Sequence, residues 1–121
     1  MIEAEKFAKA ILKRGPILYP KGDTYDDVIS HIERLIKEAL KESKGKYEFE
    51  IRNAAWLHDV AKTVSSRENG LESLRLCKRF IEEQNFSSEQ KEIIIDCILN
   101  NYEGDLPKTE AGKIFQRTHA L

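Results

Sequence analysis

The fold class is decided by residues 25–43, YDDVISHIERLIKEALKES, which carry the clearest periodic pattern in the chain. Apolar residues recur there at positions i, i+3, i+4 and i+7, the spacing that collects side chains on one stripe of an α-helix. The stripe consists of Tyr25, Val28, Ile29, Ile32, Leu35, Ile36 and Ala39. Asp23 or Thr24 can cap such a helix, and Asp26 and Asp27 complement its dipole in the first turn. The segment therefore predicts an amphipathic helix with one buried face.

Helical spacing recurs on both sides of this segment. The ranges expected to be helical are 2–13, 25–43, 48–62, 71–81, 88–102 and 109 to the C-terminus. Prolines and glycines mark residues 15–24 as a loop, whose Ile17, Leu18 and Tyr19 we expect to pack over the core. Ser87 begins a capping-box pattern before the fifth of these helices.

Length and composition fit one helical domain. The chain has 121 residues, enough for one hydrophobic core, so we expect a single domain over residues 1–121. Neither internal repeats nor strand-like alternation occur, and the sequence predicts an all-α, compact bundle of about five to six helices. No apolar run is long enough to span a membrane, and the N-terminus lacks the apolar run of a secretory signal. We therefore expect a cytoplasmic protein that makes no contact with a membrane.

Charge and cysteine content exclude further classes of protein. A net charge of -1 argues against a nucleic-acid partner, because nucleic-acid binding draws on a strong positive field. Cys77 and Cys97 stand apart, without the Cys-x-x-Cys spacing of a metal or redox motif. We expect both to be buried, reduced thiols, and we expect Trp56 to lie in the core.

Two of the three histidines point to a metal site. His58 and Asp59 are adjacent near the end of the helix expected over 48–62, and His31 lies on the margin of the apolar stripe of 25–43. An imidazole and a carboxylate held side by side can both face one divalent ion. The alternative is that His31 is a boundary residue and that His58 packs against alanines of its own helix beside a solvated Asp59.

These residues resemble the HD superfamily of metal-dependent phosphohydrolases, an all-helical family named for its paired His-Asp ligands. The resemblance covers residues 25–121. It depends on His31 followed by Arg34, as in the family's His-x-x-Arg, on His58 and Asp59 after an apolar segment, and on Lys62, as in His-Asp-x-x-Lys.

The resemblance implies a function and roles for these residues. In the family, the first histidine, the His-Asp pair and a distal aspartate hold a metal that activates water for attack on a phosphate ester. His31, His58 and Asp59 are thereby implied metal ligands, and Asp59 and Lys62 are implied catalytic residues. Lys62 and Arg34 are implied to bind phosphate oxygens, although ion pairs with neighbouring glutamates are an equal alternative.

The chain departs from the family pattern at three places. Arg117 and His119 stand where the distal aspartates are expected, so His119 is the candidate for the fourth metal ligand. The alternative is that His119 is a surface or disordered residue near the chain end. Asn69 and Asn100 stand where two-metal members carry two further histidines, which favours one metal over two. The chain also ends where most relatives continue with more helix, so a C-terminally truncated or degenerate member is left open.

The sequence therefore predicts a phosphohydrolase that uses one divalent ion, Zn, Ni, Fe, Mn or Co, and acts on a soluble phosphate ester such as a nucleotide. The alternative, favoured by the missing aspartate, is a non-catalytic HD-like domain that binds a ligand or a protein partner. A homo-oligomer is left open as well.

Overall fold

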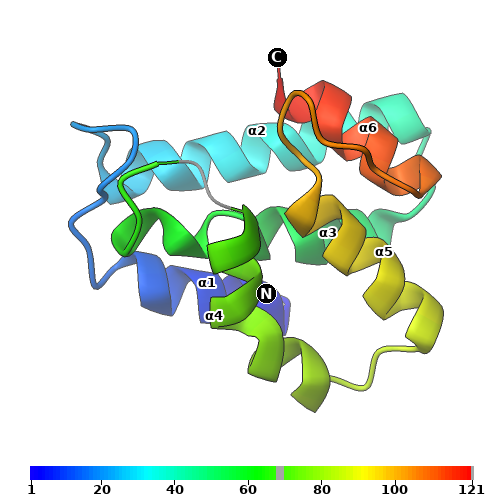
Figure 1. The fold of residues 1–121 in the computed structure, drawn as a ribbon, viewed down its shortest axis with the longest axis horizontal. Helices are drawn as coiled ribbons and strands as arrows, with labels where there is room; N and C mark the ends of the chain where they lie inside the picture. The colour runs from blue at the N-terminus through cyan, green and yellow to red at the C-terminus, as the bar shows by residue number, and fades with distance from the viewer. Residues whose placement is uncertain (68–69, 121) are drawn as a thin grey trace.

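A computed structural model describes residues 1–67 and 70–120, which form an all-α bundle without a strand (Figure 1). The helices are α1 (Glu3–Leu12), α2 (Tyr25–Ser43), α3 (Glu48–Leu57), α4 (Gly70–Glu83), α5 (Ser88–Leu99) and α6 (Glu110–His119). A short 3-10 helix, η1 (Val60–Thr63), connects α3 to α4. The predicted fold class is confirmed. Within these described ranges, no helix is both long and apolar enough to cross a membrane.

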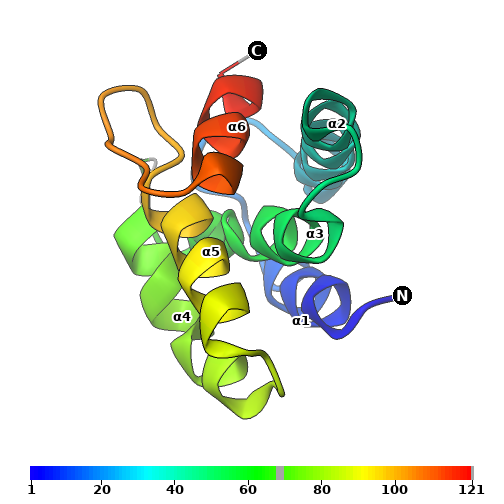
Figure 2. The same ribbon diagram turned by 90° about the vertical axis from the view of Figure 1, so that its right-hand side faces the viewer.

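The centre of the bundle is α3. It contacts α1, α2, α4, α5 and α6, and Figure 2 shows it nearly end-on between α1 and α2 with α5 beside it. Ala54, Ala55 and Leu57 are fully buried, and Trp56 is 4% exposed, so every side of this stretch packs against protein. An α-helix that is apolar all round is a buried helix. The residues that follow α3 therefore start from the interior of the molecule.

Helix α2 packs against both α3 and α6. Of the two expected caps, Thr24 is the one used: its Oγ1 accepts from the amide of Asp27, whose carboxylate accepts in return from the amide of Thr24. Val28, Ile32 and the rest of the predicted stripe face inward as expected, with Tyr25 and Ile29 half-buried. This packing brings the middle of α2 close to the end of α3.

The α-helix predicted over 48–62 is wrong at its end, because α3 stops at Leu57. The carbonyl oxygen of Ala55 would accept from the amide of Asp59 in a continuing helix. It lies instead 2.6 Å from His58 Nδ1. Asp59 leaves the helical conformation with φ -107° and ψ 6°, and η1 begins after it. The amide of His58 still donates to the carbonyl of Ala54 at 2.9 Å, so the interruption takes Asp59, and not His58, out of the helical register.

Three further expectations need correction. Leu18 does not pack over the core but is 39% exposed. The hydrogen bond from its amide to the carbonyl of Lys62 fixes the loop with the Leu18 side chain pointing outward. The fifth helix ends at Leu99 and not near Tyr102, since Asn101 Nδ2 caps the carbonyl of Ile98 at 2.6 Å. The fourth helix, expected over 71–81, runs from Gly70 to Glu83, and Leu71 in its first turn is 51% exposed.

A buried carboxylate fixes the start of α6. Asp96, 6% exposed at the end of α5, accepts hydrogen bonds from the amides of Lys108 and Thr109, from Thr109 Oγ1 and from Asn100 Nδ2. Gly112 allows this approach, because a Cβ at that position would overlap the Asp96 carboxylate. Helix α6 is therefore anchored to α5 through side-chain chemistry as well as packing.

The loop between α5 and α6 is anchored in the same way. Gln116 Nε2, on α6, donates to the carbonyls of Tyr102 and Asp105 at 2.7 and 2.9 Å. The amide of Tyr102 donates to Asp105 Oδ2. These bonds hold Tyr102 over the C-terminal half of α6.

The two cysteines and Trp56 behave as predicted. Cys77 and Cys97 are free and buried, and burial raises the pKa of the Cys77 thiol to about 12. A thiol with so high a pKa is a poor nucleophile near neutral pH. Trp56 is buried, with Lys9 Nζ 5.3 Å from its ring centroid.

Candidate metal centre

His58 lies at the C-terminal end of α3 with 1% of its surface exposed. Its Nδ1 donates to the carbonyl of Ala55, which places the ring proton on Nδ1 and leaves a lone pair on Nε2. This Nε2 is buried and has no hydrogen-bond partner among the described residues. Burial, and next the neighbouring His31, lowers the pKa of His58 to about 3, so the ring is neutral near pH 7. A neutral imidazole with an unused nitrogen is ready to bind a metal.

Asp59 is the second buried group of the site, at 3% exposure. Its Oδ1 lies 3.2 Å from His58 Nε2, and its Oδ2, also buried, has no hydrogen-bond partner among the described residues. His58 Nε2 and Asp59 Oδ1, both electron-rich, therefore face each other in the interior of the protein. Burial raises the pKa of Asp59. Groups of this kind are stabilised when a cation binds between them.

His31 approaches from α2. Its Nε2 lies 3.8 Å from Asp59 Oδ2, and its ring centroid lies 6.0 Å from that of His58. Burial lowers the pKa of His31, although the Asp59 carboxylate acts in the opposite direction. On its outer side, Nδ1 faces Arg34 Nη2 at 3.3 Å. The sequence predicts His31 on the margin of the apolar stripe of α2. The structure agrees, because Nε2 of the ring faces the site and Nδ1 faces outward.

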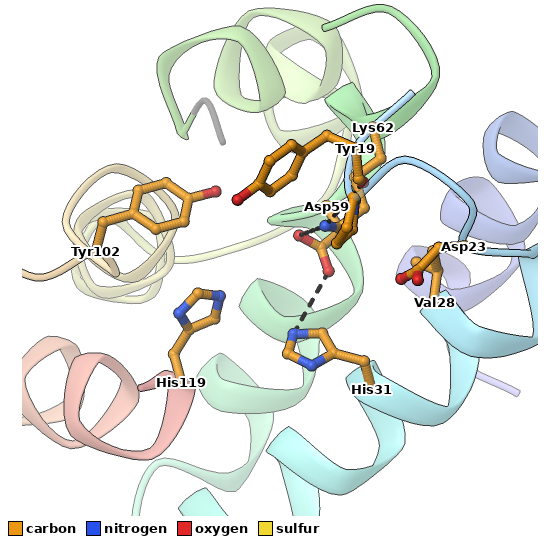
Figure 3. Close-up of a pocket in the computed structure, with 9 residues that line it drawn as sticks. Tyr19, Asp23, Val28, His31, Asp59, Lys62, Tyr102 and His119 are labelled. Atoms are coloured by element: carbon orange, nitrogen blue, oxygen red, sulfur yellow. Dashed lines mark hydrogen bonds and ion pairs between the residues drawn. The ribbon is translucent and has the colours of Figure 1, made fainter. Parts of the chain in front are cut away.

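His119 lies at the end of α6 and completes the group of histidines. Figure 3 shows it in the same pocket as His31 and Asp59. Its ring centroid lies 5.2 Å from that of His58 and 5.6 Å from that of His31. Burial, and next the neighbouring His58, lowers its pKa to about 3. One nitrogen from each of His31, His58 and His119 lies within 4.8 Å of the others, close enough for all three to hold one metal ion.

His31 and His119 open onto a pocket of about 200 Å³, whereas His58 is buried and is not among its lining residues. Its lining residues are Tyr19, Pro20, Asp23, Val28, His31, Asp59, Lys62, Tyr102 and His119. Lys62 Nζ donates to the carbonyl of Tyr19 at 3.2 Å and lies 3.9 Å from Asp59 Oδ1. Only 15% of the Lys62 side chain is exposed, so its charge is fixed on the pocket wall. The site thus combines neutral metal donors, a carboxylate and one held cation.

The predicted site residues are not all in this pocket. His31, His58, His119, Asp59 and Lys62 come together from α2, α3, α6 and the start of η1. Arg34 is exposed, does not line the pocket and contacts the outer nitrogen of His31. Of the two asparagines at the positions of further histidines, Asn100 donates a hydrogen bond to Asp96 outside the site. Asn69 lies outside the described residues.

Sequence reasoning gave no site role to five residues of the pocket wall, which are Tyr19, Pro20, Asp23, Val28 and Tyr102. Tyr19 was expected to pack over the core, Asp23 was considered only as a helix cap, and Tyr102 was placed on a helix. The prolines around Tyr19 and the glycine after Tyr102 do mark loops. Nothing in the residues of a loop, however, tells which site the loop covers.

The comparisons with known proteins add no identification: no family model, no curated protein and no solved structure matches this chain.

Proposed function

We propose that this chain is a metal-dependent phosphohydrolase that acts on a small, soluble phosphate ester, as its resemblance to the HD superfamily implies. The observation that carries the proposal is the cluster of His31, His58 and His119 nitrogen atoms beside the buried Asp59, at the wall of a pocket that His31, Asp59 and His119 line. A fixed lysine, Lys62, lies on the same wall.

The donor set fits a divalent transition metal. Three imidazoles that are neutral near pH 7 suit Zn²⁺, Ni²⁺, Fe²⁺ or Co²⁺, and one carboxylate adds partial charge neutralisation. The unpartnered His58 Nε2 and Asp59 Oδ2 are the atoms that such an ion would satisfy. A bound ion would supply a Lewis acid that polarises a phosphoryl oxygen and lowers the pKa of a water molecule.

The chain's own residues would bind and orient the ester. Lys62 is held by the carbonyl of Tyr19 and by Asp59, so its ammonium is placed for a phosphate oxygen without ordering a flexible side chain. Such a cation stabilises the negative charge that phosphate oxygens carry during transfer. In this proposal the Asp59 carboxylate would orient a water molecule or take its proton.

A non-catalytic binding domain is the second candidate. The identity of His119 favours a binding domain, because a neutral imidazole takes the place of an expected carboxylate. Among the described residues, Asp59 is then the only carboxylate within 4 Å of His31 and His58. A site with fewer carboxylates has fewer groups that can accept a proton from water. Such a domain would bind the metal and a phosphorylated ligand without turnover.

One pair of measurements tests both candidates. The protein is purified without chelator, its metal content is measured by elemental analysis, and hydrolysis of a panel of phosphomonoesters is assayed before and after metal removal. About one ion per chain and turnover that disappears on removal would support the enzyme. Bound metal without turnover of any of the phosphomonoesters would support the binding domain. A chain that takes up none of these metals would contradict both.

A further inference from the structure

We infer that Asp23 makes the pocket selective for a short phosphomonoester that carries a protonated amine. This inference rests on the proposed function, because it concerns the organic part of the ester whose phosphate would lie at Lys62 and the metal centre. It names a substrate class that the three histidines by themselves do not define.

Asp23 contributes a carboxylate to the pocket that the fold does not use elsewhere. It is half-buried and lines the pocket, and Figure 3 shows its carboxylate beside Val28 with the oxygens turned toward the space between Asp59 and His31. The helix cap that follows is made by Thr24 and Asp27. The Asp23 side chain makes no hydrogen bond or ion pair with any residue that the structure describes. Its negative charge is therefore available to a ligand.

The backbone holds this carboxylate in place. The amide of Asp23 donates to the carbonyl of Pro20 at 3.1 Å, which closes the turn before α2. The same loop is tied to η1, because the amide of Leu18 donates to the carbonyl of Lys62 at 2.7 Å. The segments that carry Asp23 and Lys62 are thus joined by a backbone hydrogen bond.

The volume of the pocket favours a short ester. It measures about 200 Å³, whereas pockets that enclose drug-sized ligands measure roughly 300–1,000 Å³. A phosphate group with a chain of a few carbons fits such a volume, and a nucleoside would have to extend into solvent. Val28 and Pro20 also line the pocket and provide apolar surface for that chain.

Charge balance favours an amine at the far end of the ester. With a divalent ion bound, the charges of the ion, Lys62, Asp59 and Asp23 sum to about +1, and a phosphate group carries about -2 near neutral pH. An ester that also carries one ammonium group has a net charge of about -1 and neutralises the pocket. A charge-assisted hydrogen bond from the ammonium to Asp23 would fix its orientation.

The test compares 2-aminoethyl phosphate with propyl phosphate, which has nearly the same shape but a methyl group in place of the ammonium. Binding to the zinc-loaded protein is measured by calorimetry at about 0.15 M salt, where distant charges are screened. We expect 2-aminoethyl phosphate to bind about tenfold more tightly, a difference typical of one charge-assisted hydrogen bond. Asp23→Asn should remove this preference, because the ammonium loses its acceptor and the pocket gains one positive charge that favours the dianionic propyl phosphate.

Asp26→Asn is the matched control, because Asp26 is an exposed acid of the first turn of α2 that does not line the pocket. It should keep the preference. Equal binding of the two esters by the wild type, tighter binding of adenosine monophosphate than of 2-aminoethyl phosphate, or an equal loss of preference in Asp26→Asn would each overturn the inference about Asp23. Failure of the zinc-loaded wild type to bind any of the three esters would instead overturn the proposed function.

Discussion

Arg34 Nη2 lies 3.3 Å from Nδ1 of His31, on the side of the ring that faces away from the pocket. A guanidinium only donates, so this contact needs a lone pair on Nδ1 and puts the ring proton on Nε2. Metal binding through Nε2 needs the opposite tautomer, with the proton on Nδ1. The Arg34 contact and metal binding by His31 therefore exclude each other.

We expect Arg34→Gln to tighten zinc binding. In the wild type, zinc binding must first break the exposed contact between Arg34 and His31, which costs roughly 0.5–1 kcal/mol. Arg34→Gln removes this cost, so the affinity for zinc should rise about two- to fivefold. Competition with a chromophoric chelator measures the change. Lys37→Gln removes another exposed cation of α2 and should have no such effect. If Arg34 instead binds phosphate, as the resemblance implies, Arg34→Gln would weaken the binding of phosphate esters.

The sequence predicts the helices better than the ends of the helices. The stripe of residues 25–43 and the capping box at Ser87 are local patterns, and both are present in the structure. The end of α3 depends on a contact between the ring of His58 and a carbonyl of its own helix, and no spacing of apolar residues reveals it.

The residues of the candidate site likewise differ in whether the sequence alone could reveal them. His31, His58 and Asp59 could be singled out because their residue types and spacing carry chemistry. His119 was singled out only through the resemblance, and the structure places it 5.2 Å from His58, ring centroid to ring centroid. Tyr102 and Asp23 reach the pocket through loops whose course depends on distant bonds, such as those from Gln116 to the carbonyls of Tyr102 and Asp105.

His58→Ala should abolish metal binding. His58 contributes a buried nitrogen that has no other partner among the described residues, so the substitution removes a ligand without breaking a structural bond at Nε2. Loss of a residue that merely orients a ligand costs roughly 10- to 100-fold in metal affinity, and we expect the loss of His58 to exceed this range. Asn53→Ala, which removes a buried polar side chain on the same helix, should retain the metal. Unchanged metal content of His58→Ala by elemental analysis would show that His58 is a packing residue.

Gly112→Ala should destabilise the protein and weaken the site at a distance. The added Cβ would overlap the Asp96 carboxylate, and it would lie 3.0 Å from Thr109 Oγ1. Overpacking of this kind costs roughly 1–3 kcal/mol, and displacing a buried hydrogen-bonded carboxylate adds to it. Urea unfolding measures the loss, with Lys113→Ala as the exposed control on α6. Wild-type stability of Gly112→Ala would mean that α6 is not anchored through Asp96.

Asp96 should also contribute to the acid limb of the stability curve. Burial alone would raise the pKa of Asp96, but the hydrogen bonds from Thr109, Lys108 and Asn100 outweigh it and lower the pKa below the ordinary value of 3.8. The folded state therefore binds the proton more weakly than the unfolded state. The stabilisation is complete above pH 3.8 and is lost as the pH falls through the lower, folded-state value.

Asp96→Asn should accordingly be less stable than the wild type at pH 7, and the difference should shrink as the pH falls below 3.8. Chemical unfolding between pH 2 and pH 7 measures both curves. A difference in the free energy of unfolding that stays constant over this range would show that the charge of Asp96 is irrelevant to its role.

His119→Asp is the substitution that separates an enzyme from a binding domain. It replaces a neutral donor with a carboxylate, which strengthens the hold on harder ions such as Mn²⁺ and supplies a group that can orient water or take its proton. We therefore expect slow or absent hydrolysis by the wild type and faster hydrolysis by the variant. Because an aspartate side chain is shorter than a histidine, His119→Glu serves as the second variant that keeps the reach.

Thermal unfolding provides a readout for His119→Asp that does not depend on turnover. Without metal, the new carboxylate would be buried close to Asp59, and two like charges in one site destabilise the fold. With metal, the added charge tightens binding and raises the melting temperature by mass action. The rise in melting temperature on adding Mn²⁺ should thus be larger for the variant than for the wild type. Robust hydrolysis by the wild type that falls in both His119→Asp and His119→Glu would contradict this account, because it would show that the third imidazole is itself part of a working catalytic site.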